Sequence, residues 1–225
     1  MNIRKCVKKD SDYPKRLREY SQSPECLYYM GDISLCNADI CCVIGKRDAS
    51  SGALELATRV GRQLASKRVT ILNGMARGCD TSVLKGALVG NGKVICVMPC
   101  GLDTPYPSSN RRLFENIVSG GGCVISEYPA GVSPMKHYFL KRDLIQAMLA
   151  DKLIVVDCDE NGGTFYTAKN AIKYGKIVGC CKFSEMGTGN NVFLMSGKVT
   201  PISNLNDLDS FINMSEFVQL SFGDV

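Results

Sequence analysis

Short apolar runs recur along the chain every 24 to 30 residues, and a segment with helical spacing separates each run from the next. The six runs are 40–44 (ICCVI), 69–72 (VTIL), 93–98 (KVICVM), 123–126 (CVIS), 152–156 (KLIVV) and 176–180 (KIVGC). Runs without polar alternation are typical of strands buried on both faces, and the helices between them predict crossover connections. The pattern therefore predicts the α/β class: a doubly wound, mostly parallel, Rossmann-like sheet in a single domain.

Polar residues mark where the first helices should begin. Between the first two runs, Leu54, Ala57, Gly61 and Leu64 recur at helical spacing and predict the first helix. Ser50 or Ser51 is expected to cap that helix, because a hydroxyl oxygen can accept from a free amide of the first turn. Asp80 is expected to cap the next helix, and Ser108 or Ser109 the one after.

Charge and turn residues divide the chain into three parts. The Rossmann-like domain is expected over 38–200, between a basic N-terminal extension (1–37) and an acidic C-terminal extension (201–225). Residues 1–20 carry a net charge of +4, and residues 200–225 a net charge of −4. The sequence leaves open whether the basic arm folds onto the domain or stays mobile.

The overall composition is that of a globular protein. The 225 residues are 45% apolar and 22% charged, which excludes collagen, coiled coil and wholesale disorder. The net charge is +5, and the arm and tail cancel one another. This balance lacks the single-sign field of a generic nucleic-acid coat, so any phosphate site should be local.

Twelve cysteines could suggest a disulfide scaffold, but the apolar stretches ICCVIG, KVICVM and IVGCC alone contain five of them, and in such surroundings a thiol behaves as a small hydrophobe. The N-terminus has no apolar signal core, and no run is long enough to span a bilayer. We therefore expect a cytoplasmic protein with no membrane partner and with buried, reduced thiols. His137 is the single histidine and no Cys-x-x-Cys pair occurs, so no metal is expected. Redox sensing by an exposed thiol stays open.

The loops after parallel strands meet at one edge of the sheet, where ligands bind in this class of fold. The first loop offers Gly45 for a tight turn, Lys46 and Arg47 for charge, and Ser50 and Ser51 at a helix start that attracts anions. It matches neither a dinucleotide fingerprint nor a Walker loop. The alternative is a capped turn with two solvated bases.

Two further loops share these features. Gly74 and Arg77 follow the second run, and Gly162, Gly163 and Thr164 precede the helix after the fifth. Glycines at a helix N-terminus let the backbone approach a phosphate. Alternatively, Arg77 pairs with an acid and the two glycines form only a tight turn.

Bases and aromatics alternate beyond the fourth run. Within 134–143, Lys136 and Arg142 flank Phe139, as on a surface that holds phosphates while an aromatic ring stacks on a base. Alternatively, Phe139 packs inward and the bases are solvated. Together the loops predict a nucleotide or phosphate-backbone site, with no catalytic residue and no cofactor.

The order of the motifs resembles the DprA (Smf) family of DNA-processing proteins, whose Rossmann-like domain is related to the LOG phosphoribohydrolases. The similar segments are YPKRL, LYYMGD, VIGKRDASSG, NGMARGCDTSVLKGAL, GLDTPYPSSNRRL, ISEYPAG, FLKRDLI, NGGTFYTA and GNNVFL, in family order over about residues 13–212. The resemblance implies single-stranded DNA binding, a recombination-mediator role, a RecA-type partner and a homodimer. It also implies that Gly45, Lys46, Arg47, Lys136 and Arg142 hold phosphates while Phe139 stacks.

This chain departs from the family pattern in several places. The usual arginine-asparagine-arginine run is replaced by Arg142, Asp143 and Leu144, so that one base is lost and an acid is introduced. The histidine of the second loop's helix and the proline-glycine after the sixth strand are missing. The winged-helix domain that often follows is also expected to be absent.

Two other functions compete with DNA binding. A non-catalytic pocket that senses or sequesters a small nucleotide would use the same phosphate loops. An enzyme resembling the LOG phosphoribohydrolases ranks lowest, because the helix after Gly162, Gly163 and Thr164 contains no acid.

Overall fold

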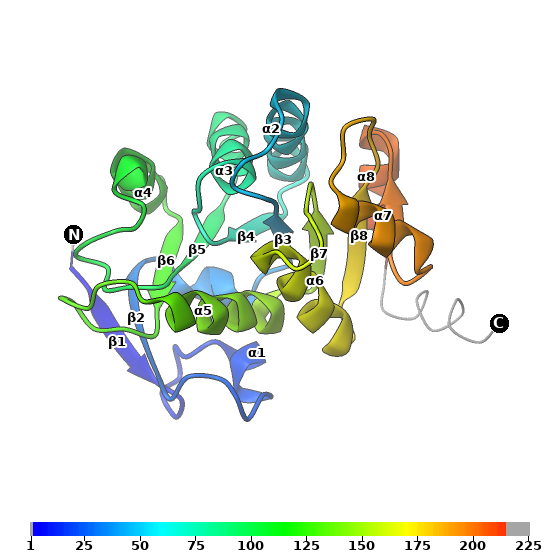
Figure 1. Ribbon diagram of the computed structural model, residues 1–225. Helices are drawn as coiled ribbons and strands as arrows, with labels where there is room; N and C mark the ends of the chain where they lie inside the picture. Colours follow the sequence, from blue (N-terminus) through cyan, green and yellow to red (C-terminus); the bar gives the residue numbers. More distant parts are fainter. Residues whose placement is uncertain (1, 215–225) are drawn as a thin grey trace.

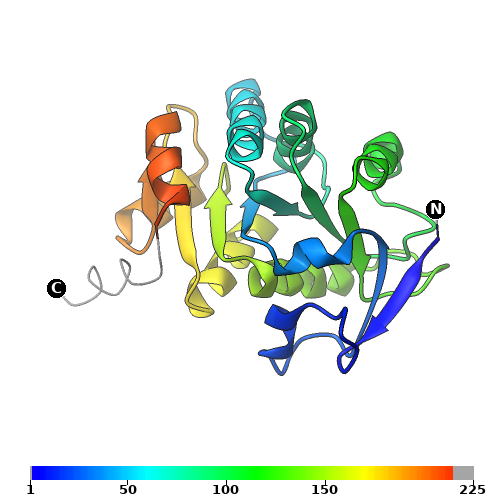
Figure 2. The ribbon, with the colours of Figure 1, turned by 180° about the vertical axis from the view of Figure 1, so that it is seen from behind.

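One mixed sheet runs through the part of the protein that the computed structural model describes, residues 2–214 (Figures 1 and 2). Its nine strands are β1 (Arg4–Val7), β2 (Cys26–Gly31), β3 (Ile40–Ile44), β4 (Thr70–Asn73), β5 (Val94–Met98), β6 (Cys123–Ser126), β7 (Lys152–Val155), β8 (Ile177–Cys181) and β9 (Thr200–Ile202). Their order is β1-β2-β6-β5-β4-β3-β7-β8-β9. Strands β3 to β9 pair in parallel, and β1 and β2 are antiparallel. The doubly wound, mostly parallel sheet predicted from the apolar runs is confirmed.

Strand β3 lies at the point where the winding reverses. From β3 the chain moves outward through β4, β5 and β6, and then returns to place β7 on the other side of β3. The adjacent connections leave β3 and β7 in opposite directions, which opens a crevice beyond their carboxyl ends. The fold thus sets one place for a ligand.

Helices cover both faces of the sheet, as the two views show. One face carries α2 (Ser51–Ser66), α3 (Cys79–Val89), α4 (Arg111–Ser119) and α8 (Leu205–Ile212). The other carries α1 (Lys15–Arg18), α5 (Lys136–Leu149), α6 (Gly163–Lys173) and α7 (Thr188–Met195). Two short 3₁₀ helices, η1 (Ile33–Asn37) and η2 (Ser108–Asn110), complete the elements. Two apolar cores therefore sandwich the sheet, and this explains why the central strands β3, β4 and β5 are buried at every position.

The basic arm folds onto the domain. Strand β1 pairs with β2, and β2 pairs with β6, so both join the main sheet. Tyr13 and Leu17 are fully buried in the core on the α5 side. At the other end β9 and α8 extend the sheet, while the rest of the acidic tail, 215–225, lies outside the described residues. The division of the chain into a domain over 38–200 and two extensions, 1–37 and 201–225, stays a prediction.

The predicted helix starts are right at one position and wrong at two. Ser50 caps α2, and its hydroxyl oxygen accepts from the Ala53 N–H at 3.2 Å. Asp80 is not a cap, because α3 already begins at Cys79 after a glycine with positive φ. Ser108 and Ser109 are not caps either, since they form the 3₁₀ turn that precedes α4.

The cysteines are free, and all but Cys26 are buried, as the apolar runs predicted. Burial raises the pKa of Cys79 to about 12, so this thiol stays protonated at neutral pH. Within residues 2–214 no group of three metal-binding side chains occurs. No helix in the same range is long and apolar enough to cross a membrane.

Candidate binding site at the carboxyl edge of the sheet

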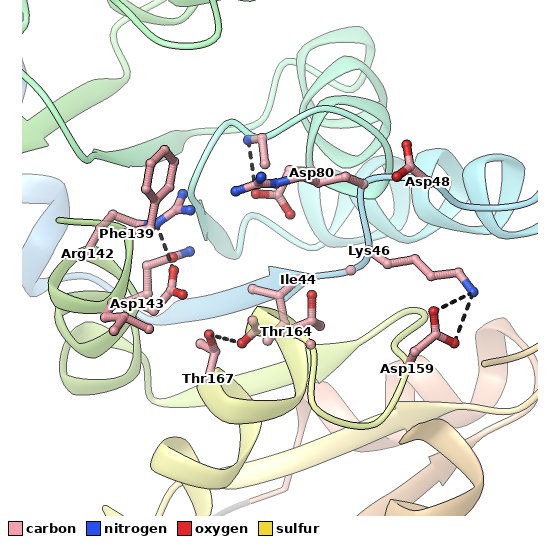
Figure 3. Close-up of a pocket in the computed structure, with 17 residues that line it drawn as sticks. Ile44, Lys46, Asp48, Asp80, Phe139, Arg142, Asp143, Asp159, Thr164 and Thr167 are labelled. Atoms are coloured by element: carbon pink, nitrogen blue, oxygen red, sulfur yellow. Dashed lines mark hydrogen bonds and ion pairs between the residues drawn. The ribbon is translucent and has the colours of Figure 1, made fainter. Parts of the chain in front are cut away.

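A cavity of about 400 Å³ opens beyond the carboxyl ends of β3 and β7, where the winding reverses (Figure 3). Its size falls within the range of small-molecule sites. The lining residues are Ile44, Gly45, Lys46, Arg47, Asp48, Ala76, Asp80, Phe139, Leu140, Arg142, Asp143, Gln146, Asp159, Gly162, Gly163, Thr164 and Thr167. Loops far apart in the sequence therefore meet at the place that the topology selects.

The structure brings together most of the residues that the sequence singled out. Those that line the cavity are Gly45, Lys46, Arg47, Phe139, Arg142, Gly162, Gly163 and Thr164. Gly74 and Arg77 line a smaller adjoining pocket, which shares Arg47, Ala76, Phe139 and Arg142 with the first. Ser50, Ser51 and Lys136 line neither; Ser50 caps α2, and Lys136 is exposed at the start of α5.

Gly45 lets the first loop pack tightly against the start of α3. A Cβ at this position would overlap the Cβ of Cys79. The next residue ties the loop to the neighbouring strand, because the Lys46 N–H donates to the Asp157 carbonyl oxygen at 2.8 Å. The loop after β3 is thus fixed to both α3 and the end of β7.

The side chain of Lys46 is held by two carboxylates. Its Nζ lies 3.2 Å from Asp157 Oδ2 and 3.4 Å from Asp159 Oδ1. The Asp157 side chain is fully buried, and its Oδ1 accepts from the Gly187 N–H at 2.7 Å. Burial lowers the pKa of Lys46, but the two carboxylates outweigh that effect and raise it. The ammonium therefore neutralises a buried acid before it meets any ligand.

Arg142 is similarly occupied. Its Nη1 donates to the Gly74 carbonyl oxygen at 2.7 Å, and its Nε lies 2.8 Å from Asp143 Oδ1. The side chain is only 7% exposed. The amide of Gln146 satisfies both its ends when its nitrogen faces Asp143 Oδ1, at 3.3 Å, and its oxygen faces the Gly74 N–H, at 3.0 Å. These contacts make Arg142 part of the cavity wall.

Two aspartates in the wall have raised pKa values. Burial raises the pKa of Asp80 to about 6, although Arg142 opposes the shift and Oδ2 accepts from the N–H groups of Gly74 and Ala76. Burial also raises the pKa of Asp143, and the adjacent Arg142 limits the shift. Two carboxyl groups that take up a proton more readily than usual therefore line the cavity.

Arg47 and Phe139 meet at the mouth of the cavity. The Arg47 guanidinium lies over the Phe139 ring, 5.3 Å from its centroid, within the range of a cation–π contact. Tyr106 packs edge-on against the same ring at 5.6 Å. Within residues 2–214 Arg47 forms no ion pair and its side chain is exposed. It is therefore available to an anion, as the buried Arg142 is not.

The charge balance of the lining differs from the positive focus that the sequence suggested. Three bases, Lys46, Arg47 and Arg142, face four acids, which are Asp48, Asp80, Asp143 and Asp159. The difference arises because the fold brings acids from distant segments beside the bases; Asp159, for example, pairs with Lys46 from more than a hundred residues away. Sequence reasoning noted Asp143 only as a departure from a pattern, and it took Asp80 for a helix cap. Gln146 was not predicted as a site residue. It lies four residues after Arg142 and three after Asp143, so helical spacing on α5 could have indicated that it shares their face.

Fold and site together define a class of protein: a Rossmann-like α/β domain with a polar cavity at the switch point of its sheet and an arginine–aromatic pair at the mouth. Within that class, the chain belongs to the family described as DNA recombination-mediator protein A, which it matches over residues 4–213.

Known proteins support this assignment. The chain is 33% identical over 169 residues to DNA processing protein DprA of Streptococcus pneumoniae, covering 75% of this chain and 59% of that one. The X-ray structure of that DprA superposes with a TM-score of 0.87 at 28% identity, covering 96% of this chain and 76% of the other. DNA processing protein A from Helicobacter pylori, described for its single-stranded DNA binding mode, superposes with a TM-score of 0.83 at 27% identity, covering 94% and 95%. The chain spans 43% and 59% of the lengths of two curated relatives.

Proposed function

We propose that the protein binds single-stranded DNA across the carboxyl edge of the sheet and acts as a recombination mediator. The observation that carries this proposal is the pairing of the exposed Arg47 with Phe139 at the mouth of the cavity. An aromatic ring offers a stacking surface to any base, and a nearby guanidinium offers charge to the adjoining phosphate. The DNA binding mode described for the Helicobacter pylori relative supports the same choice of ligand.

The proposal divides the predicted phosphate residues into two groups. Arg47, Arg77 and Lys136 are exposed, and they contact phosphates along the rim. Lys46 and Arg142 hold the wall through their ion pairs. Gly45 and Gly74 give the close backbone approaches on which that wall depends. Gly163 and Thr164 present free N–H groups of the first turn of α6 to the ligand. Gly162 precedes that turn, and its own N–H donates to the Asp159 carbonyl oxygen at 3.2 Å.

The proposed role is binding rather than catalysis. The aspartates with raised pKa values are both engaged in contacts within the cavity wall. Asp80 accepts from two backbone N–H groups, and Asp143 pairs with Arg142. Asp80 thereby holds the loop after β4, and Asp143 holds Arg142, which donates to the Gly74 carbonyl oxygen of the same loop. The proposal accordingly assigns no catalytic residue.

Fluorescence anisotropy with a labelled oligothymidine tests the proposal. Submicromolar binding is expected at about 50 mM salt, and it should weaken as salt rises because counterions are released from the phosphates. Arg47→Ala and Lys136→Ala should each weaken binding and lower the salt slope by about one. Arg59→Ala removes an exposed base on α2, away from the cavity, and serves as the control. Absence of binding at about 50 mM salt would contradict the proposal.

A small nucleotide is the second candidate ligand, and the size of the cavity favours it. The same phosphate and stacking groups would then serve a single ligand. Heat-released extract of the purified protein distinguishes the two cases. A stoichiometric nucleotide in that extract would favour the small ligand, and an extract free of nucleotides together with oligothymidine binding would favour DNA.

A homodimer and a RecA-type partner complete the proposal. Both are what the resemblance to the DprA (Smf) family implies. Light scattering on the purified protein tests the dimer, and a pull-down with a RecA-type recombinase in the presence of single-stranded DNA tests the partner. A monomer over the full concentration range, or no capture, would remove the respective element.

A further inference from the structure

Helix α6 leads from the cavity to the opposite edge of the sheet (Figure 1). Its first turn lines the cavity through Gly163 and Thr164. The helix ends at Lys173, four residues before β8 begins, so its far end lies at the amino edge of that strand. Its 11 residues span about 16 Å. The helix therefore offers a path of that length to a ligand that extends beyond the cavity.

One face of α6 is exposed and carries an aromatic ring and two bases. Tyr166, Lys169 and Lys173 are three and four residues apart, so they lie on the same side of the helix. Tyr166 is 47% exposed, and both lysines are exposed. Lys169 Nζ lies over the Phe165 ring, 5.7 Å from its centroid, a contact that leaves its charge unneutralised. Over the residues that the structure describes, neither lysine forms an ion pair.

The charge along this segment has a single sign. Residues 161–184 contain four lysines and no aspartate or glutamate, with Glu160 and Glu185 on either side. The cavity lining, in contrast, has more acids than bases. Because like charges repel, a polyanion gains more from the exposed face of α6 than from the interior of the cavity. The charge distribution thus favours a strand whose phosphates pass over α6.

A second cluster of aromatic and basic side chains lies at the end of α6. Tyr174 follows the helix directly, and its ring centroid lies 5.1 Å from that of Tyr20. Lys176 Nζ lies 5.7 Å from the Tyr20 ring centroid. This arrangement repeats that of Arg47 over Phe139 at the mouth of the cavity. The exposed face of α6 joins the two clusters.

We infer that single-stranded DNA continues from the cavity along α6, with phosphates on Lys169 and Lys173 and a base stacked on Tyr166. The strand then reaches the cluster of Tyr20 and Tyr174. A row of bases and aromatic rings is the arrangement that binds single strands without reading their sequence. The inference rests on the proposed function, and it adds the route and the length of the ligand. A mononucleotide held in the cavity would not extend along the helix.

Anisotropy with two oligothymidines, of about 4 and about 16 nucleotides, tests the inference, because these lengths bracket the site sizes known for single-strand-binding grooves. The double variant Lys169→Ala, Lys173→Ala should lower the salt slope for the long oligothymidine by about 1.4, since each phosphate contact on a single strand contributes about 0.7. Tyr166→Ala should weaken binding of the long oligothymidine at least about fivefold, through the loss of one stacked base. Neither change should alter binding of the short oligothymidine.

The control is the double variant Arg59→Ala, Lys85→Ala, which removes two exposed bases from α2 and α3 on the other face of the sheet. It should bind both lengths as the wild type does, and thermal melts show that each variant is folded. Equal losses for the two lengths, equal losses in the control, or wild-type binding of the long oligothymidine by the lysine variant would each overturn the inference. In all three cases the wild type still binds, so the proposed function stands. If the wild type binds neither length, the proposed function fails as well.

Discussion

Arg142 and Gly74 are locked together across the site: Nη1 of the arginine, on α5, donates to the Gly74 carbonyl oxygen at 2.7 Å, just after β4. The guanidinium occupies the space that a side chain at position 74 would need, since a Cβ there would overlap Nη1. The glycine is therefore required by a partner that lies 68 residues away in the sequence.

Gly74→Ala should displace Arg142 from the cavity wall. Overpacking of this kind costs about 1–3 kcal/mol of unfolding free energy. Gly52→Ala is the matched control, because a Cβ at Gly52 would make only ordinary contacts, at 3.6 and 3.9 Å, in an exposed turn of α2. Urea denaturation of the two variants checks the prediction, and equal stabilities would show that Arg142 moves aside without cost.

Asp80 should make the stability depend on pH. Its pKa is raised from 3.8 to about 6 in the folded protein, mainly by burial and against the opposing charge of Arg142, while Asp143 reinforces the shift. The folded state therefore binds more protons than the unfolded state between pH 4 and 6. The contribution of Asp80 to the unfolding free energy falls as pH rises through this window, by roughly 3 kcal/mol at most.

Asp80→Asn removes that titration and retains one oxygen for the backbone amides. Relative to this variant, the wild-type chain should lose stability between pH 4 and 7. Denaturant titrations at several pH values measure the difference. A difference that is independent of pH would show that Asp80 does not titrate in this range.

Lys46 should matter more for stability than for affinity. Lys46→Met leaves the fully buried Asp157 carboxylate without its cation, and breaking a buried pair in this way costs about 3–5 kcal/mol. Lys141→Met, which breaks the exposed pair with Glu127, should cost less than about 1 kcal/mol. Thermal and urea unfolding compare the two, and similar small losses would argue that Lys46 faces the ligand instead.

Phe139 should contribute stacking but no charge. Phe139→Ala should weaken oligothymidine binding by about 1–3 kcal/mol while leaving the salt slope unchanged, because no cation is removed. Phe139→Tyr keeps a ring and should bind nearly as well. A change of salt slope in the alanine variant would mean that the ring acts by holding Arg47 in place.

The central strands of the sheet could be predicted from the sequence, whereas the edge strands β1 and β9 could not. Runs such as 40–44 are apolar throughout, because both faces of the strand are covered, and this signal survives without knowledge of the tertiary structure. Strand β1 has two exposed basic residues in four, and β9 is three residues long and contains Pro201, so neither shows a strand pattern. Their pairing depends on neighbours that are distant in the chain.

The location of the site could be predicted, but the state of its charges could not. Parallel strands end at one edge, so the loops after them meet there whatever their sequence. Whether a base is free depends on which acid the fold brings beside it. Lys46 meets Asp157 and Asp159 only after β7 has paired with β3, whereas Arg47, one residue further on, stays exposed.

Photocrosslinking tests the central claim most directly, because it reports where the DNA lies. An oligothymidine containing one 5-iododeoxyuridine is irradiated with the protein, and the modified peptide is located by mass spectrometry. The account predicts a crosslink to the peptide containing Phe139 or Tyr106, and its loss in Arg47→Ala at a concentration near the wild-type Kd. Crosslinks confined to the basic arm, with none at the carboxyl edge of the sheet, would contradict it.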